Sequence, residues 1–422
     1  MKSSILAGLV LAALLLSQSS QTLLPGGVVD ISEVNGGAVG SDDDDFSEID
    51  GGYEMLGKFS DRLWGEVAGK AEVLSPISAY MALAMTAGGA RGTTLDAFGC
   101  LGIGSGESEL SAEQAGAKMR VLIDSLTEKK GSTKLSIANS VWVDERFELR
   151  DDFVKFLKKY YSADAFSENL PASVGKVNSW IEEKTNGLIC DMLDEIDPGT
   201  ALLLINTIYM DAKWAVPFEK EATYEEDFTS ASGEKVSVDM MHRIGKMSTI
   251  DADGLEGIVL PYDDGRLQFV ALMPTEGTTS ELISTLVGER SIGALALTAK
   301  DERVRLTLPK LELSSSISLK QPLIAMGMGE AFGDGADLSG LCESDVGFCI
   351  SEVLQNARLR LDEEGTEAAA ATVVAVRTTS IIHEDPPREM AFDKPFVWAV
   401  VDTMCSDENR IVLFCGQVDT IG

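Results

Sequence analysis

The sequence predicts an α+β fold, because helical patterns gather in the first half of the chain and strand patterns in the second. Apolar residues recur at three- and four-residue steps near residue 60, whereas later segments alternate or are continuously apolar. After residue 52 the sequence holds neither an internal repeat nor a Pro/Gly-rich linker. We therefore expect one large domain over residues 53–422.

Two helices are predicted at the start of this domain. The first covers Tyr53–Leu74, where apolar residues recur every three or four positions from Leu56 to Val67. The second follows "LSPIS". Ser75 and Pro76 fit a helix start, and the glycines that close "AYMALAMTAGGARG" fit a helix end.

Strands are predicted from residue 134 onward. "KLSIANSVWV" (Lys134–Val143) places its apolar residues on one side, which is typical of a strand. "ALLLINTIYM" (Ala201–Met210) is continuously apolar and bounded by charge, as a strand buried on both faces would be. Further strands are expected at "LQFVALMP", "RVRLTLPKL", "PFVWAVVD" and "RIVLFCGQV".

The N-terminus carries the pattern of a secretory signal peptide at residues 1–20. Met1 and Lys2 precede the apolar run Ile5–Leu16 and the polar "SQSSQ". A short anchor helix is the alternative, but no later run reaches the roughly 18 apolar residues that a membrane helix needs. We expect a soluble protein secreted into the extracellular space, with no membrane partner.

Residues 21–52 predict an acidic, low-complexity leader. This segment is rich in Gly, Ser and acid and includes "SDDDDFSEIDGG". Such a composition buries too little apolar surface to offset the entropy lost on ordering, so we expect disorder.

The charge balance excludes polyanionic partners. The chain has 35 Lys and Arg against 68 Asp and Glu, a net charge of −33. Because this charge repels phosphate and sulfate polymers, we expect no nucleic-acid partner and no glycosaminoglycan partner.

The sequence contains six cysteines, none of them in a CxxC or zinc-finger spacing, so a metal role is not expected. Cys342 and Cys349 are the pair closest in sequence for a disulfide, and buried free thiols are the alternative. The six are Cys100, Cys190, Cys342, Cys349, Cys405 and Cys415.

Enzymatic motifs are not found. His242 and His383 are the two histidines of the sequence, and no Gly-x-Ser-x-Gly elbow accompanies them. "GMGEAFGDG" (Gly327–Gly335) has the wrong spacing for a dinucleotide fingerprint, and a helix end with a turn fits it better. We expect no cofactor and no catalytic residues.

The segment "EEGTEAAAATVVAVRTTS" (Glu363–Ser380) combines helix-favouring alanines with strand-favouring threonines and valines. From Thr366 to Thr378 the even positions are uncharged, while Glu367 and Arg377 fall at odd positions. As a strand, the segment would hide one face and expose the other. Its polar, proline-containing flanks also fit an exposed loop, and an ordinary helix or strand is the alternative.

In this context the chain resembles the serpin family. "EEGTEAAAAT" is similar to the family's hinge, and "FDKPFVW" and "FCGQV" are similar to its C-terminal strands. The resemblance covers the chain from about residue 53 to its end. Further similar segments follow in the family's order: "LSPISAYMALAMTAGGARGTT", "SIANSVWV", "VNSWIEEKTNGLI", "LLINTIYMDAKWAVPF", "VSVDMMHRIGKM", "LPKLEL" and "GADLSG".

The resemblance implies the serpin fold: a large central mixed β-sheet with further sheets, a bundle of helices, and an exposed reactive-centre loop at about residues 363–391. It implies a protease inhibitor, not an enzyme. A target serine protease cuts the loop, is held as a covalent acyl-enzyme, and is carried along when the cleaved loop inserts into the central sheet. It also implies a monomer that can polymerise by loop–sheet insertion.

Small, neutral hinge residues favour an inhibitory member of the family, because the hinge must enter a sheet interior. A non-inhibitory serpin, acting as a carrier, storage protein or chaperone, is the alternative. The hinge residues that the resemblance implies are Glu363, Gly365, Thr366, Glu367, Ala368, Ala369, Ala370, Ala371 and Thr372.

The resemblance also implies a polar shutter beneath the opening sheet, at Ser75, Ser78 and Asn206, and a breach, where insertion begins, at Trp214. Helix capping, a core amide and plain packing are the structural alternatives for these residues. Gln355 stands where many serpins have a shutter histidine, and it can bond Asn206 or Ser75 without titrating near neutral pH.

The scissile bond is predicted from the family's usual spacing from Glu363, which leads to Thr379–Ser380. A small β-branched residue there suits elastase-like or subtilisin-like proteases. Arg377–Thr378 is the alternative and suits trypsin-like enzymes, and neighbours such as Ile381 stay open.

Overall fold

The computed structural model describes residues 50–106, 109–128, 131–187, 189–190, 192–288, 290–343, 347–366, 386–404 and 410–421. These residues belong to one compact unit. Among them, no helix has both the length and the apolar content needed to cross a bilayer. The helices are α1 (Asp50–Val67), α2 (Pro76–Ala87), α3 (Gly92–Asp96), α4 (Ala112–Thr127), α5 (Asp151–Tyr161), α6 (Val174–Lys184), α7 (Thr279–Gly288), α8 (Ile292–Leu297) and α9 (Lys320–Leu323).

The strands gather from residue 134 onward, which confirms the predicted α+β class. They are β1 (Lys134–Asp144), β2 (Glu148–Leu149), β3 (Asp164–Glu168), β4 (Leu202–Lys213), β5 (Thr223–Thr229), β6 (Lys235–Ala252), β7 (Leu255–Pro261), β8 (Leu267–Pro274), β9 (Lys300–Pro309), β10 (Leu311–Ser318), β11 (Cys342–Glu343), β12 (Glu352–Leu361), β13 (Gly365–Thr366), β14 (Arg388–Ala391), β15 (Phe396–Asp402) and β16 (Ile411–Val418).

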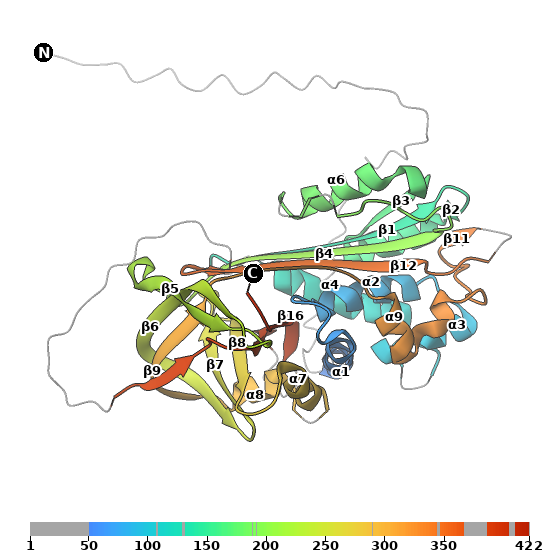
Figure 1. Cartoon of the computed structure of the whole chain (residues 1–422). Helices are drawn as coiled ribbons and strands as arrows, with labels where there is room; N and C mark the ends of the chain where they lie inside the picture. Colours follow the sequence, from blue (N-terminus) through green and yellow to red (C-terminus); the bar gives the residue numbers. More distant parts are fainter. Residues whose placement is uncertain are drawn as a thin grey trace, which may run out of the picture. The chain divides into compact units, whose positions relative to one another are not determined.

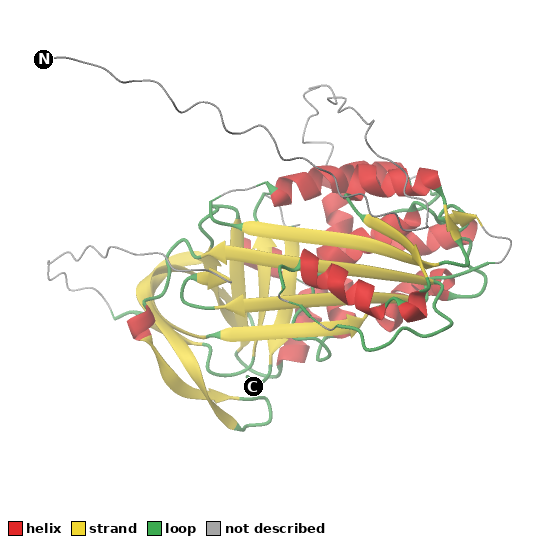
Figure 2. Ribbon diagram, turned by 90° about the horizontal axis from the view of Figure 1, so that it is seen from above, coloured by secondary structure: helices red, strands yellow, loops and turns green. Residues whose placement is uncertain are grey.

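The central sheet is mixed and has the strand order β10-β12-β13-β4-β1-β3. β1 runs parallel to β3 and antiparallel to β4, and β12 runs parallel to β4 over six residue pairs. Figure 1 shows α6 on one face of this sheet and α1, α2, α4 and α9 on the other. In the view from above, α6 crosses in front of the strands (Figure 2).

A second sheet, of order β14-β9-β6-β7-β8-β15-β16 with β5 added to β6, forms the other lobe in Figure 1. β15 and β16 are buried along their whole length. They lie against α1, α2 and α7, so this sheet and the central sheet share one large apolar core.

β4 follows the prediction of a strand buried on both faces. Leu203 and Ile205 pack under α6 with Trp142 and Trp180, whereas Leu204 points into the main core. Because successive side chains of a strand point to opposite faces, a continuous apolar run is what this position requires.

The first two predicted helices are present, and α1 differs from its prediction at both ends. α2 begins at Pro76 after Ser75, as predicted. α1 begins at Asp50, three residues before the predicted start. It ends at Val67, seven residues before the predicted end, because Gly69 adopts a positive φ of 74° that stops the helix. Leu74 instead forms a β-bridge with Cys415.

The described cysteines, which exclude Cys405, are all free thiols. The Cys342–Cys349 disulfide is therefore not formed, and the buried-thiol alternative fits better. Burial raises the pKa of the Cys342 thiol to about 12, so it stays protonated and inert near neutral pH.

Candidate functional site

The short strand β13 lies between β12 and β4 at one end of the central sheet. Thr366 pairs antiparallel with Leu361 of β12 and with Ala212 of β4. Farther along, β12 and β4 pair directly with each other, from Glu352 opposite Leu203 to Ala357 opposite Ile208. The sheet is thus wedged open at one end and closed at the other.

Thr366 is held in the open end by an aromatic pair. Its side chain is buried, and its Oγ1 lies 2.7 Å from the hydroxyl of Tyr262. The Tyr262 ring stacks on Trp214 with centroids 4.8 Å apart, and Trp214 Nε1 donates to Asp362 O at 2.9 Å. The predicted breach residue Trp214 therefore contacts the hinge, and Tyr262 is a further contact that the sequence did not indicate.

The backbone around Gly365 leaves no room for a side chain. A Cβ atom on this residue would lie 2.0 Å from Ala212 O and 2.6 Å from Lys213 Cα, both backbone atoms that cannot move aside. The hinge enters between two strands at this point, so only glycine fits.

Two ion pairs hold the glutamates of the hinge. Lys310 Nζ lies 3.3 Å from Glu363 Oε2, and Lys220 Nζ lies 2.6 Å from Glu364 Oε1. Burial would raise the pKa of Glu363, but the hydrogen bond from its own backbone and the charge of Lys310 outweigh burial and hold this pKa below its ordinary value. The hinge glutamate is therefore ionised at neutral pH.

The turn that follows β4 also binds the hinge backbone. Trp214 N donates to Glu364 O, and Phe218 N donates to Glu363 O, each at 2.8 Å. These contacts join residues about 150 positions apart, which is why sequence patterns did not reveal them.

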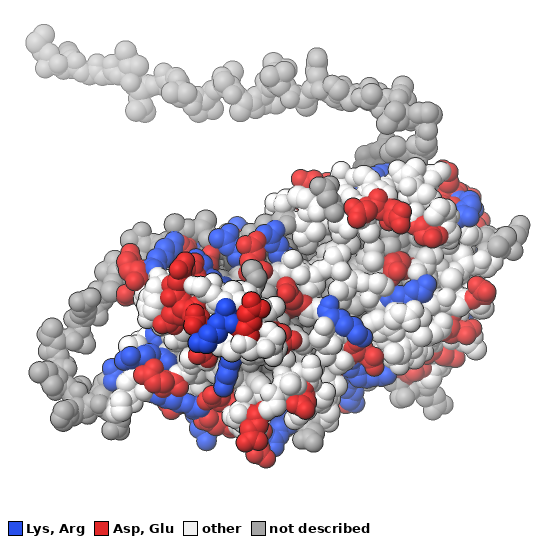
Figure 3. Space-filling model, viewed as in Figure 1, with Lys and Arg blue, Asp and Glu red and all other residues white. Residues whose placement is uncertain are grey.

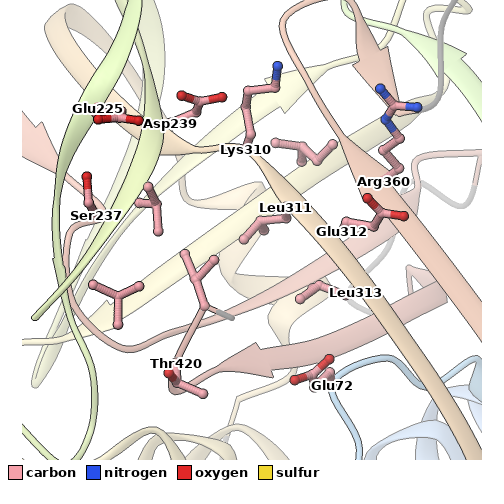
Figure 4. A pocket seen from close by; sticks show the side chains of 14 residues that line it. Glu72, Glu225, Ser237, Asp239, Lys310, Leu311, Glu312, Leu313, Arg360 and Thr420 are labelled. Atoms are coloured by element: carbon pink, nitrogen blue, oxygen red, sulfur yellow. The ribbon is translucent and has the colours of Figure 1, made fainter. Parts of the chain in front are cut away.

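A pocket of about 570 Å³ lies beside the hinge, with leucines of β10 in its wall. Figure 4 shows Lys310 near Glu225 and Asp239 at one side, and Arg360 near Glu312 at another. The lining holds the carboxylates of Glu72, Glu225, Asp239 and Glu312 together with the basic side chains of Lys310 and Arg360. This mixture of charges selects no single class of ligand.

The predicted shutter residues lie at the closed end of the sheet, Asn206 and Gln355 in its strands and Ser75 and Ser78 at the start of α2. Gln355 Nε2 donates to Ser75 O at 2.8 Å, and Ser75 N donates to Gln355 Oε1 at 2.9 Å. Ser75 Oγ donates to Leu413 O at 2.6 Å and does not cap α2. The predicted contact of Gln355 with Ser75 is present.

The Asn206 side chain bonds a neighbouring strand, and Gln355 takes the Ser75 alternative of its prediction. Asn206 lies opposite Gln355 in the sheet, yet its Nδ2 donates to Asn139 Oδ1 on the neighbouring strand β1. Its own Oδ1 is buried without a hydrogen-bond partner, and so is Ser78 Oγ. The shutter therefore holds two buried polar atoms without a partner, an amide oxygen and a hydroxyl.

The remaining predicted residues fall outside the described part of the chain: Glu367, Ala368, Ala369, Ala370, Ala371, Thr372, Arg377, Thr378, Thr379, Ser380, Ile381 and His383. After them, Arg388 starts β14, which runs parallel to β9. Its guanidinium contacts Asp251 at 2.8 Å and Glu256 and Glu302 at 2.9 Å, which fixes this end of the segment to the second sheet.

On the face shown in Figure 3, Lys and Arg side chains are interspersed with Asp and Glu side chains. Of the described residues, none gather as three or more His, Cys, Asp or Glu side chains able to hold a metal ion.

Comparison with known proteins agrees with this geometry. The family model for Serpin (serine protease inhibitor) matches residues 55–420. Alpha-1-antiproteinase S of Cavia porcellus is 32% identical over 350 residues, covering 82% of this chain and 83% of the relative. Alpha-1-antitrypsin of Sus scrofa is 32% identical over 377 residues, covering 86% and 85%.

A solved structure is similar along nearly the whole described fold. The thermophilic serpin tengpin in its native state has a TM-score of 0.79 and 32% identity, covering 88% of this chain and 95% of tengpin. With the matched family model and the wedged central sheet, these similarities establish that the chain belongs to the serpin family and is a protease inhibitor rather than an enzyme.

Proposed function

We propose that this chain is a secreted suicide-substrate inhibitor that traps a serine endopeptidase as an acyl-enzyme by inserting its cleaved loop between β4 and β12. The observation that carries the proposal is β13: the first hinge residues already occupy the place of the new strand. The six parallel residue pairs between β4 and β12 are what further insertion must separate.

The register of β13 predicts where each inserted residue would lie. If the pairing of Thr366 with Ala212 and Leu361 continues, Thr372 falls opposite both Asn206 and Gln355. Even-numbered residues then share the face of Thr366, toward the core, and this is the face that the sequence keeps free of charge.

The shutter supplies a driving force for this insertion. A buried polar atom without a partner costs about 1–3 kcal/mol, and Asn206 Oδ1 and Ser78 Oγ are two such atoms. The hydroxyl of Thr372 would arrive beside Asn206 and donate a hydrogen bond to its Oδ1. New ladder hydrogen bonds on both edges of the inserted strand add to this gain.

The inserted strand would run from Thr366 to Thr379, a length of roughly 46 Å at about 3.3 Å per residue. The acylated protease would be carried a comparable distance, and its distorted active site would no longer complete hydrolysis. We place the scissile bond at Thr379–Ser380, which suits an elastase-like or subtilisin-like target. The basic residue Arg377 is the alternative and suits a trypsin-like target.

Secretion is part of the proposal and is supported by the N-terminal sequence alone. Expression of the full chain in a eukaryotic secretory host, followed by N-terminal sequencing of the medium, tests it. A protein that starts after the apolar run near residue 20 supports secretion. Retention of an intact N-terminus in the membrane fraction favours the anchor-helix alternative.

The inhibitory mechanism is tested by incubating the protein with pancreatic elastase, subtilisin and trypsin. We expect an SDS-stable complex and a C-terminal fragment that begins at Ser380. The same proteases with their catalytic serine blocked are the control, and they should form no complex. Cleavage without a complex against the whole panel would favour the non-inhibitory alternative.

A further inference from the structure

β6 has an open edge in its middle. One edge pairs with β9 from Met240 to Thr249. The other edge pairs with β5 as far as Met241 and with β7 from Ser248 onward. Between these points, no strand of the described chain pairs with the second edge of residues 242–247, so their backbone is available to another strand.

This open edge forms one wall of a large groove. The groove has a volume of about 1450 Å³, and residues 213–222 of the turn after β4 form its opposite wall. Ala215 N donates to Pro261 O, which holds the turn to the end of β7. Val216 on the turn and Ile244 on β6 are 59% and 52% exposed, which is unusual for large apolar side chains.

Arg243 is a cation in this groove without a carboxylate partner among the described residues. Its guanidinium lies over the Phe218 ring, 4.9 Å from the centroid, and donates to Val216 O. Two lysines of the groove are paired, Lys220 with Glu364 and Lys246 with Asp301. The groove lining also includes the carboxylates of Glu219, Glu221 and Asp263, so an acidic ligand must place its carboxylate at Arg243 and away from them. An arginine has five donors, so several remain for a ligand.

Burial lowers the pKa of Arg243 to about 10, which still leaves the side chain charged at neutral pH. Desolvation also makes a carboxylate contact worth more than it would be on an open surface. The groove thus contains both the open backbone edge of residues 242–247 and the partly desolvated guanidinium of Arg243.

We propose that this groove binds an extended segment of a partner protein in which acidic and apolar residues alternate, by strand addition to residues 242–247 of β6. The backbone of the segment pairs with the open edge. A carboxylate on one face binds Arg243, and an apolar side chain on the other face packs on Ile244, because neighbouring residues of a strand point to opposite faces. The groove exceeds the roughly 300–1,000 Å³ of a small-molecule site, which fits a peptide.

The test uses the intact protein and two fluorescein-labelled peptides, acetyl-Val-Glu-Val-Glu-Val-amide and its lysine counterpart, acetyl-Val-Lys-Val-Lys-Val-amide. We expect the acidic peptide to raise fluorescence anisotropy on titration and the basic peptide to bind at least about tenfold more weakly. Hydrogen exchange should slow at residues 242–247 when the acidic peptide is bound.

Variants locate the contact. Arg243→Gln and Ile244→Lys should each weaken binding of the acidic peptide roughly tenfold, and the exposed position of Ile244 makes its variant safe for folding. Val121→Lys on α4, a similarly exposed apolar position outside the groove, should change nothing.

Several results would overturn the proposal: no binding of the acidic peptide, equal binding of the basic peptide, or affinity unchanged in both groove variants. Binding without slowed exchange at residues 242–247 would contradict strand addition. None of these measurements involves a protease, so they are independent of the inhibitory mechanism.

Discussion

The two ends of the contact between β4 and β12 differ in how well their buried polar groups are satisfied. At the open end, Thr366 is bonded to Tyr262. At the closed end, Asn206 Oδ1, Ser78 Oγ and both polar atoms of the Asn356 amide are buried without a partner. The open end has fewer such atoms, with Glu364 Oε2 as its example. At about 1–3 kcal/mol for each unsatisfied group, the closed end therefore stores more free energy than the open end.

This difference explains how the central sheet can be stable before cleavage and still accept a new strand between β4 and β12. The entrance is fixed by ion pairs, aromatic stacking and backbone hydrogen bonds. The path beyond it is closed by a parallel strand contact over unsatisfied amides. Insertion from the open end therefore moves from a region with fewer unsatisfied groups into one that gains more from a new strand.

The largest expected effect comes from Thr366→Arg, which places a charge at the entrance. Its side chain would have to displace the contact with Tyr262 and enter a dry site between two strands, which costs several kcal/mol. We expect the variant to be cleaved as a substrate, with SDS-stable complex reduced at least tenfold on a gel. Thr366→Ser keeps the hydroxyl and should keep inhibition. Undiminished complex from Thr366→Arg would contradict insertion through β13.

The fold class and the closed end were largely predictable from sequence. The continuous apolar run of β4 and the start of α2 are local patterns, and the Gln355–Ser75 contact followed from family resemblance. The partner of Asn206 was not predictable, because Asn206 has two neighbours in the sheet and only the register of β1 brings Asn139 beside it.

The open end was predictable only in part. The small residues of the hinge are visible in the sequence, but Tyr262 lies 104 positions from Thr366. Its role depends on the β7–β8 turn meeting the end of β4, which no periodic pattern encodes. The early end of α1 was missed for a different reason: apolar periodicity continued past Gly69, whose backbone ends the helix.

The next largest effect is expected from Asp61→Asn on α1, which changes how the stability of the protein depends on pH. Burial raises the pKa of Asp61 on α1 from 3.8 to about 7. The neutral form is favoured in the fold, so this stabilisation is complete below about pH 4 and is lost as pH rises through 7. Asp61→Asn should stabilise the protein by about 2–4 kcal/mol at pH 8 and little at pH 4, by urea unfolding.

The Asp61→Asn variant also isolates the pH response of the shutter at the closed end. Gln355 does not titrate, and the lowered pKa of Glu363 affects stability only as pH falls below about 4.5. In the Asp61→Asn background, stability should therefore be nearly flat from pH 5 to 8. A remaining proton uptake in that range, abolished by substitution of Gln355, would contradict the assignment of a non-titrating shutter.

A smaller effect is expected from Thr372→Val, which tests the closed end after insertion. If Thr372 arrives opposite Asn206 and Gln355, removing its hydroxyl leaves Asn206 Oδ1 unsatisfied and destabilises the cleaved form by about 1–3 kcal/mol. The uncleaved form should unfold at the same urea concentration as the wild type. Thr372→Ser is the matched control. Equal loss in both forms would mean that the register of β13 does not continue.

The smallest expected effect comes from Tyr262→Phe at the open end. The substitution keeps the ring that stacks on Trp214 and removes only the hydroxyl bonded to Thr366, a loss of about 1 kcal/mol. We expect amide exchange at Gly365 and Thr366 to quicken several-fold while exchange in β12 near Gln355 stays unchanged, by mass spectrometry. A double-mutant cycle with Thr366→Val should recover the coupling, because either change alone breaks the same bond. Faster exchange at both ends together would mean that the sheet opens as one unit. The open end would then not act separately from the closed end.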